Sequence, residues 1–201
     1  MLIRAAKASD AGHLVRFINM AADDLPLHFW QKSVGPEGDP WAYGQDRAAR
    51  EAGSFSFRNA WLAEVDGAVA ACLLGYPAED TPAPIDPATP AILVPLLDLE
   101  ALAPGSWYLN VLATYDPFRG KGCGSALLAF AEDVAQRLGH GAISLIAADT
   151  HQDARRLYAA KGYVEVARRR VVKGDWQVDA EDWILLAKSI GQGGIAQVQG
   201  T

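Results

Sequence analysis

The chain has 201 residues, of which 50% are hydrophobic, and this suits one packed domain or one domain with insertions. Its formal net charge of -6 argues against general nucleic-acid binding, which needs a basic face, and no apolar run reaches the roughly 18–20 residues that span a bilayer. The N-terminal sequence MLIRAAKASD lacks the apolar stretch of a signal peptide, so we expect a cytoplasmic protein that contacts neither nucleic acid nor a membrane.

The first quarter of the chain predicts one strand and two helices. Residues 2–5 are typical of a short strand, and Ser9 or Asp10 then offers a cap for a helix with an apolar face. Prolines, glycines and aromatic residues crowd the stretch 23–41, so we expect irregular structure there. A second, more polar helix is predicted at 45–52.

A β-hairpin and an insertion follow. Residues 61–65 and 68–76 flank the dipeptide Asp66-Gly67, which suits a tight turn between two antiparallel strands. Several prolines mark 77–90 as a loop or extended insertion, and a short helix is predicted at 91–102.

The rest of the chain alternates strands and helices. In chain order, we expect a strand at 107–113, a helix at 125–138, a strand at 142–148, a helix at 153–161, and strands at 163–172 and 183–187. The Gly/Gln-rich stretch 191–201 has little to bury, so we expect a flexible tail. The whole order predicts an α/β fold with a mixed sheet and helices on both of its faces.

The run Arg119-Gly120-Lys121-Gly122-Cys123-Gly124 joins the strand at 107–113 to the helix at 125–138. Glycines let the backbone approach a ligand closely. The first N–H groups of the helix lack internal partners and carry the positive end of its dipole. Two cations beside those amides complete a site for an anion, most naturally a phosphate.

Two other phosphate motifs fit this run less well. A dinucleotide fingerprint needs a third glycine where Ser125 stands, and a Walker A loop needs Ser or Thr where Gly122 follows Lys121. A glycine cluster that only makes a turn remains an alternative. We expect no disulfide, because Cys72 falls in a strand and Cys123 in the glycine loop.

The spacing Arg119-x-x-Gly122-x-Gly124 resembles the pyrophosphate loop of the GNAT superfamily of acyl-CoA N-acyltransferases. The segment from Ala154 to Tyr163, with Leu157-Tyr158 and Gly162, is similar to the family's A-x-x-L-Y-x-x-x-G-[FY] motif. The resemblance covers 2 to about 187 and implies one acetyltransferase domain at 1–190 around a mostly antiparallel sheet that splays open. The insertion at about 77–105 departs from a minimal member.

The resemblance implies acetyl-CoA as cosubstrate and no metal. Main-chain groups of 112–114 would pair with the pantetheine arm, and amides of 119–125 would hold the pyrophosphate. His151 stands where the family often has Asn, while Asp149 and Asp153 are expected to cap the following helix. The cofactor set is Leu112, Ala113, Thr114, Arg119, Gly120, Lys121, Gly122, Cys123, Gly124, Ser125 and His151. Within it, Cys123 is expected to be a small helix-start residue and not an acyl carrier.

The resemblance makes Tyr158 the expected catalytic acid, because a hydroxyl beside the thioester sulfur helps the thiolate to leave. Some members carry a Glu on the strand before the glycine loop, where this chain has Tyr108. The expected acceptor-binding residues are Trp30, Tyr108 and Asn110. Asn110, on the same face as Tyr108, can bind the acceptor but cannot take its proton. The remaining candidates for a general base are His28, Asp23, Asp24, Asp98 and Glu100.

The acceptor is expected to be a primary amine of a small molecule, attacked directly within a ternary complex. The aromatic residues proposed to line its pocket are Trp30, Trp41, Tyr43 and Trp61. The run at 168–170, three arginines in sequence, is interpreted as an exposed strand edge. Two alternatives stay open: acetylation of a peptide or protein N-terminus, and a CoA-binding protein without transferase activity. A homodimer is compatible with each of these functions.

Overall fold

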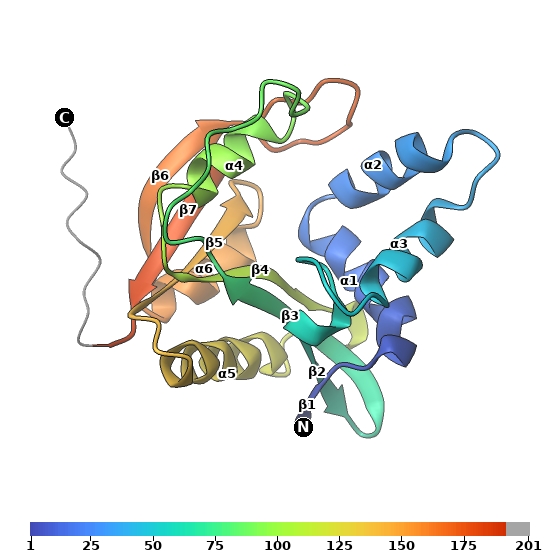
Figure 1. Cartoon of the computed structure of the whole chain (residues 1–201). Coiled ribbons are helices and arrows are strands. Elements are labelled where there is room, and N and C mark those ends of the chain that lie inside the picture. Colours follow the sequence, from blue (N-terminus) through green and yellow to red (C-terminus); the bar gives the residue numbers. More distant parts are fainter. Residues whose placement is uncertain (192–201) are drawn as a thin grey trace, which may run out of the picture. The chain divides into compact units, whose positions relative to one another are not determined.

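The computed structural model describes residues 1–191, so residues 192–201 of the expected tail lie outside the described part of the chain. It contains two compact units (Figure 1). Unit 1 comprises Met1–Tyr76 and Asn110–Ala131, and unit 2 comprises Pro77–Leu109 and the chain from Glu132 on. None of the helices within residues 1–191 is long and apolar enough to cross a bilayer.

Seven strands form the sheet in the order β1-β2-β3-β4-β5-β7-β6. Strand β4 (Trp107–Thr114) contributes residues to both units, as does helix α5 (Cys123–Arg137). The pairing of β4 with β5 is parallel, whereas β1 with β2, β2 with β3, and β7 with both β5 and β6 are antiparallel. The prediction of a mixed, mostly antiparallel sheet is therefore confirmed.

Unit 1 begins its sheet with β1 (Leu2–Ala5), β2 (Ala60–Val65) and β3 (Ala68–Pro77). Asp66 and Gly67 both have positive φ, at 52° and 79°. A type I′ turn needs that conformation at both central positions. The predicted hairpin is confirmed.

The N-terminal part of unit 1 also contains the helices α1 (Ala11–Ala21), α2 (Leu25–Val34) and α3 (Pro40–Ala48), which lie at the blue end of the colour scale in Figure 1. The prediction of irregular structure at 23–41 is wrong, because Pro26 and Pro40 stand in the first turns of α2 and α3. A proline there gives up an N–H that has no helical partner anyway.

The helix predicted at 45–52 begins and ends earlier in the structure, as α3. Asp39 caps α3 by accepting from the amides of Trp41 and Ala42, so the helix begins at Pro40 and ends at Ala48. Asp10 precedes α1, but its carboxylate binds Arg4 and the amide of Lys7 and does not cap α1.

Unit 2 is built on β5 (Ala142–Ala148), β7 (Asp182–Ser189) and β6 (Val164–Arg170), with helices α4 (Val94–Glu100) and α6 (Gln152–Ala160). The β5 strand pairs on both edges and is almost wholly apolar, as predicted. Helix α4 packs against β5, β6 and β7.

Polar contacts tie the insertion into unit 2. The hydroxyl oxygens of Ser106 and Ser144 lie 2.7 Å apart in the interior. His140 Nδ1 lies 2.9 Å from the carbonyl oxygen of Gly105, and Arg169 pairs with Asp98 of α4. These contacts join helix α4 and the C-terminal end of the insertion to the rest of unit 2.

Candidate functional site

The glycine loop turns between β4 and α5 through a short 3-10 helix, η3 (Asp116–Phe118). Gly120 and Gly122 have φ values of 72° and 83°, in the left-handed region that favours glycine. Among residues 1–191, no atom beyond the adjoining residues lies within 4 Å of the point where a Cβ would stand on either glycine. Both the backbone conformation and the space above it therefore suit a ligand that lies close to the main chain.

The first amides of α5 have no hydrogen-bond partner within the helix. The amide of Ala126 donates to the carbonyl of Gly122 at 3.0 Å, so the amides of Cys123, Gly124 and Ser125 come before the first helical hydrogen bond. They coincide with the positive end of the helix dipole, which makes this loop an anion site.

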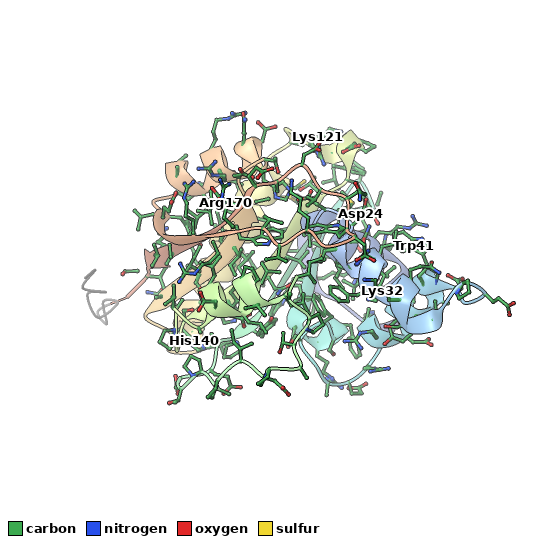
Figure 2. The ribbon with its side chains drawn as sticks, turned by 90° about the horizontal axis from the view of Figure 1, so that it is seen from above. Asp24, Lys32, Trp41, Lys121, His140 and Arg170 are labelled. Carbon is green, nitrogen blue, oxygen red and sulfur yellow. The ribbon has the colours of Figure 1, made fainter. Side chains whose placement is uncertain are left out.

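Two exposed cations flank these amides. The Arg119 Nε atom lies 3.1 Å from the Asp116 carboxylate and 3.4 Å from the carbonyl oxygen of Thr114. The Lys121 Nζ atom lies 5.2 Å from the centre of the Phe118 ring, and its side chain is labelled in Figure 2. Exposed contacts of this kind contribute little energy, so either cation can turn toward a phosphate at low cost.

The thiols of the two cysteines are both free, as expected. Cys123 is buried with 2% of its surface exposed, although it stands at the start of α5. Burial matches its interpretation as a small packing residue at the helix start.

Strand β4 presents alternate side chains to different surroundings. Val111 and Ala113 pack into the core formed with α1, and Tyr108 is buried opposite Ser144 of β5. The half-buried Asn110 donates from Nδ2 to the hydroxyl of Tyr76 at 3.1 Å. Sequence reasoning did not single out Tyr76, because only the register of β3 and β4 brings it to Asn110.

A second unexpected aromatic lies just before the glycine loop. The Tyr115 ring packs on Phe17, with 4.1 Å between ring centroids, and its hydroxyl lies 3.1 Å from Nδ1 of His13. Burial raises the pKa of the Tyr115 hydroxyl. Helix α1 therefore supports the end of β4 at the point where the loop begins.

The four aromatic residues predicted to line an acceptor pocket do not form one cluster. Trp30 and Trp41 meet with 6.1 Å between ring centroids, and the guanidinium of Arg16 lies 5.5 Å from the Trp41 ring. Trp61 instead packs against Phe130 of α5, with ring centroids 5.7 Å apart.

Within that group, Trp30 is a core residue with 7% of its surface exposed, and it packs against Gly44 of α3. Trp41 and Tyr43 are less buried and lie on α3, where Tyr43 is 5.8 Å from the guanidinium of Arg47 (Trp41 is labelled in Figure 2). Of the four predicted pocket aromatics, Trp30 is therefore buried, and Trp41, Tyr43 and Trp61 are partly exposed.

In unit 2, Tyr158 lies on α6 with 5% of its surface exposed. Burial raises the pKa of its hydroxyl, so the proton stays on the oxygen. Its carbonyl accepts from the amides of Lys161 and Tyr163, each at 3.0 Å. These two bonds hold the end of α6 and with it the position of the Tyr158 side chain.

The Tyr163 ring packs beside Tyr158, with 5.8 Å between centroids. On its other side lies an ion pair in which Lys188 donates to Glu132 at 2.7 Å, and the Lys188 nitrogen is 5.7 Å from the centre of the Tyr163 ring. Burial and then the Glu132 charge raise the pKa of Tyr163.

The predicted caps of α6 are wrong. His151 occupies the cap position without a side-chain capping bond. Asp149 accepts instead from the amide of Glu181, and Asp153 pairs with Arg156. Both carboxylates are thus used for other local contacts.

The candidates for a general base differ in their surroundings. Asp23 and Asp24 have φ values of 48° and 65° in the turn between α1 and α2, where the Asn19 amide donates to Asp24 (Asp24 is labelled in Figure 2). In that unit, His28 meets the Phe29 ring edge-on at 5.6 Å. In unit 2, burial raises the pKa of Glu100.

The other candidate in unit 2, Asp98, is paired with Arg169. The flanking arginines also pair with carboxylates: Arg168 with Glu165 and Asp182, and Arg170 with Glu181 and Asp182. Since β6 is the last strand of the sheet, the interpretation of 168–170 as a strand edge is confirmed.

Residues 16–163 match the model of the acetyltransferase (GNAT) family. The chain belongs to this family. The match includes both the glycine loop and the segment around Tyr158, so the resemblance inferred from those two motifs is confirmed. No curated protein matches the chain at a significant level.

Solved structures share the GNAT fold. A crystal structure of an acetyltransferase is 24% identical with a TM-score of 0.68, over 95% of this chain and all (100%) of that one. The polyamine N-acetyltransferase of Drosophila melanogaster, which forms N-acetylagmatine, is 16% identical with a TM-score of 0.66, over 94% and 99%. A candidate acetyltransferase of Salmonella typhimurium, solved with its cofactor acetyl-CoA, is 15% identical with a TM-score of 0.57, over 99% of each chain. At these identities the likeness establishes the fold.

Proposed function

We propose that this GNAT protein transfers an acetyl group from acetyl-CoA to a primary amine of a small molecule. The observation that carries the proposal is the glycine turn at 120–122, followed directly by the amides at the start of α5 that have no partner within the helix. Such a loop suits a pyrophosphate, and the family acts on acetyl-CoA.

The cofactor would be held mainly by the main chain. The amide of Arg119, expected to take part, donates to the carbonyl of Asp116 at 3.2 Å. The amides of 120–125 would therefore bind the pyrophosphate, with the side chains of Arg119 and Lys121 adding charge. The backbone of 112–114, beyond the pairs that β4 forms with β5, would bond to the pantetheine arm. His151 would contact that arm from α6, and the chemistry needs no metal.

Tyr158 would supply the acid. The amine nitrogen attacks the thioester carbon, the C–S bond breaks, and its electron pair goes to sulfur, which takes the hydroxyl proton. The amine proton lost after attack returns to the phenolate through water. A thiol of ordinary pKa near 8.5 leaves more readily when it is hydrogen-bonded in this way.

Two observations support a small cationic acceptor. The net charge of -6 attracts cations over a distance. The similar Drosophila enzyme acts on polyamines, which belong to this class.

One observation favours the alternative of a protein that binds CoA without transferring the acetyl group. Tyr108, which is buried, stands at a position where some members of the family have a carboxylate.

Thiol release separates these alternatives. The protein is mixed with acetyl-CoA and a panel of polyamines, arylalkylamines and N-terminal peptides, free CoA is followed with a thiol reagent, and mass spectrometry identifies the product. Turnover with a small amine and a product heavier by one acetyl group would support the proposal. Tight binding of acetyl-CoA by calorimetry without turnover of any amine would overturn it, and preference for the peptides would assign the acceptor to a protein.

A further inference from the structure

Asn110 and Tyr76 form a polar pair on two adjacent strands of unit 1. Asn110 is the first residue of β4 after the last pair with β5, Leu109 with Leu145. Its Nδ2 atom donates to the Tyr76 hydroxyl at 3.1 Å, across 34 positions of sequence.

The other polar atom of the Asn110 side chain is an acceptor without a partner. Its Oδ1 forms no hydrogen bond with any residue in the part of the chain that the structure describes. Asn110 Oδ1 is also not among the buried side-chain atoms that lack a hydrogen-bond partner, so solvent reaches it. The carbonyl oxygen is therefore open to a hydrogen-bond donor from outside the chain.

We propose that Asn110 Oδ1 accepts a hydrogen bond from the acceptor amine, and that Tyr76 is a positioning residue that holds the amide in this orientation. The inference rests on the transfer proposed above and names the group that binds its acceptor. Its chemistry is that of a neutral acceptor, which binds an N–H without taking the proton.

This bond would be stronger in the transition state than in the ground state. As the amine nitrogen attacks the thioester carbon it gains positive charge, and its N–H groups become better donors. A hydrogen bond to a charged group is stronger than a neutral one. An interaction that strengthens along the reaction raises kcat as well as binding the amine.

Tyr76 would act only through Asn110. Its hydroxyl accepts the hydrogen bond from Nδ2 and so restrains the rotation of the amide group that carries Oδ1. Without it, the Asn110 side chain can rotate among its rotamers and lose the productive orientation. The loss should therefore appear in the kinetics of the amine and leave the affinity for acetyl-CoA unchanged.

The test compares Tyr76→Phe, Asn110→Leu and the double variant in the full-length protein. With the best amine of the panel, kcat/KM for the amine should fall about 10- to 100-fold in Asn110→Leu. In Tyr76→Phe it should fall roughly 3- to 10-fold, and the double variant should be no worse than Asn110→Leu alone. The Kd of acetyl-CoA should stay within about twofold in all three, since their main-chain cofactor contacts remain.

Asn59→Ala is the matched control, because the Asn59 side-chain amide donates to the carbonyls of the nearby Gly53 and Ser54, and its kinetics should be those of the wild type. If Asn110→Leu fails to fold by circular dichroism, Asn110→Ser replaces it. Losses that multiply in the double variant, or a Tyr76→Phe variant with unchanged amine kinetics, would overturn the inference while the proposed transfer stands. Wild-type protein that turns over no amine would overturn both.

Discussion

The amide nitrogen of Ala126 lies 3.0 Å from the carbonyl oxygen of Gly122, and this bond closes the first turn of α5. Gly122, with its φ of 83°, therefore stands at the point where the chain turns into the helix and precedes the three amides of 123–125. A side chain at this position would project into the open space above the loop. A substitution of Gly122 therefore tests whether a ligand occupies this space, provided that its effect on stability is matched by a control.

Gly122→Val should weaken acetyl-CoA binding by at least about tenfold, or 1.4 kcal/mol, because the added side chain occupies the space proposed for the phosphates. Gly53→Val is the matched control, since Gly53 also has a positive φ, 99°, and open surroundings. Both variants should lose roughly 1–2 kcal/mol of stability from the left-handed backbone. Calorimetric titration with acetyl-CoA measures the difference, and equal affinities in the two variants would contradict the phosphate site.

Tyr158→Phe should lower kcat about a hundredfold while the Kd of acetyl-CoA stays within twofold, because only the proton donor is lost. Burial raises the pKa of the Tyr158 hydroxyl above its ordinary value. The wild-type kcat should therefore show no alkaline decline from this group below pH ~10. A pH profile from 6 to 10 for both proteins checks both points, and full activity of Tyr158→Phe throughout would exclude this residue as the acid.

Local turn chemistry made much of the fold predictable. Asp66-Gly67 predicts a hairpin because its two positive φ values suit few other residues, and the apolar run of β5 predicts a strand buried on both faces. The stretch around Pro26 and Pro40 was misjudged for the converse reason. A proline breaks a helix in its interior but is tolerated in its first turn, and composition alone does not say where the first turn lies.

The candidate site contains features that the sequence predicts and others that it does not. Its glycine loop and the Tyr158 segment are continuous in sequence and were predictable as motifs. The pairs Asn110–Tyr76 and His13–Tyr115 join residues 34 and 102 positions apart, so they depend on strand register and helix packing. A shift of one residue in the pairing of two strands moves every side chain to the other face of the sheet, and the sequence alone does not determine that pairing.

Asp10→Asn should destabilise the protein by about 1–3 kcal/mol at pH 7, because Arg4 would lose a charged partner that it contacts at 2.8 Å and 3.0 Å. The hydrogen bond from Arg4 holds the pKa of Asp10 below its usual value. A depressed carboxyl pKa stabilises the fold above the unfolded pKa near 3.9, and this contribution is lost as the pH falls through the folded pKa.

Urea unfolding at pH 7 and pH 3 measures this effect, and the difference between wild type and variant should shrink at the lower pH. Asp153→Asn is the control, because that carboxylate belongs to an exposed pair with Arg156, and it should change stability by less than about 0.5 kcal/mol. An Asp10→Asn variant as stable as the control at pH 7 would show that the Arg4 network does not hold β1 to the rest of unit 1.

Tyr163→Phe should make the protein less sensitive to alkali. Burial and the charge of Glu132 raise the pKa of Tyr163, and burial alone raises that of Tyr158, so both hydroxyls keep their protons in the folded state after unfolded tyrosines have begun to ionise near pH 10. Above that pH the native state binds more protons than the unfolded state, so the free energy of unfolding falls as the pH rises. Each such group contributes up to about 1.4 kcal/mol per pH unit until its folded pKa is reached.

Removing the Tyr163 hydroxyl should therefore make the free energy of unfolding fall less steeply between pH 10 and pH 11. Urea unfolding at pH 9, 10 and 11 measures this change. Tyr43→Phe is the contrasting control, because the hydrogen bond from Ser33 and then Arg47 lower the pKa of Tyr43. A group whose folded pKa lies below the unfolded value stabilises the fold as the pH rises, so its loss should not flatten the decline. If Tyr163→Phe declines as steeply as the wild type, the interior around Tyr158 admits water when the pH rises, and the hydroxyl proposed as the acid is less shielded than its 5% exposure indicates.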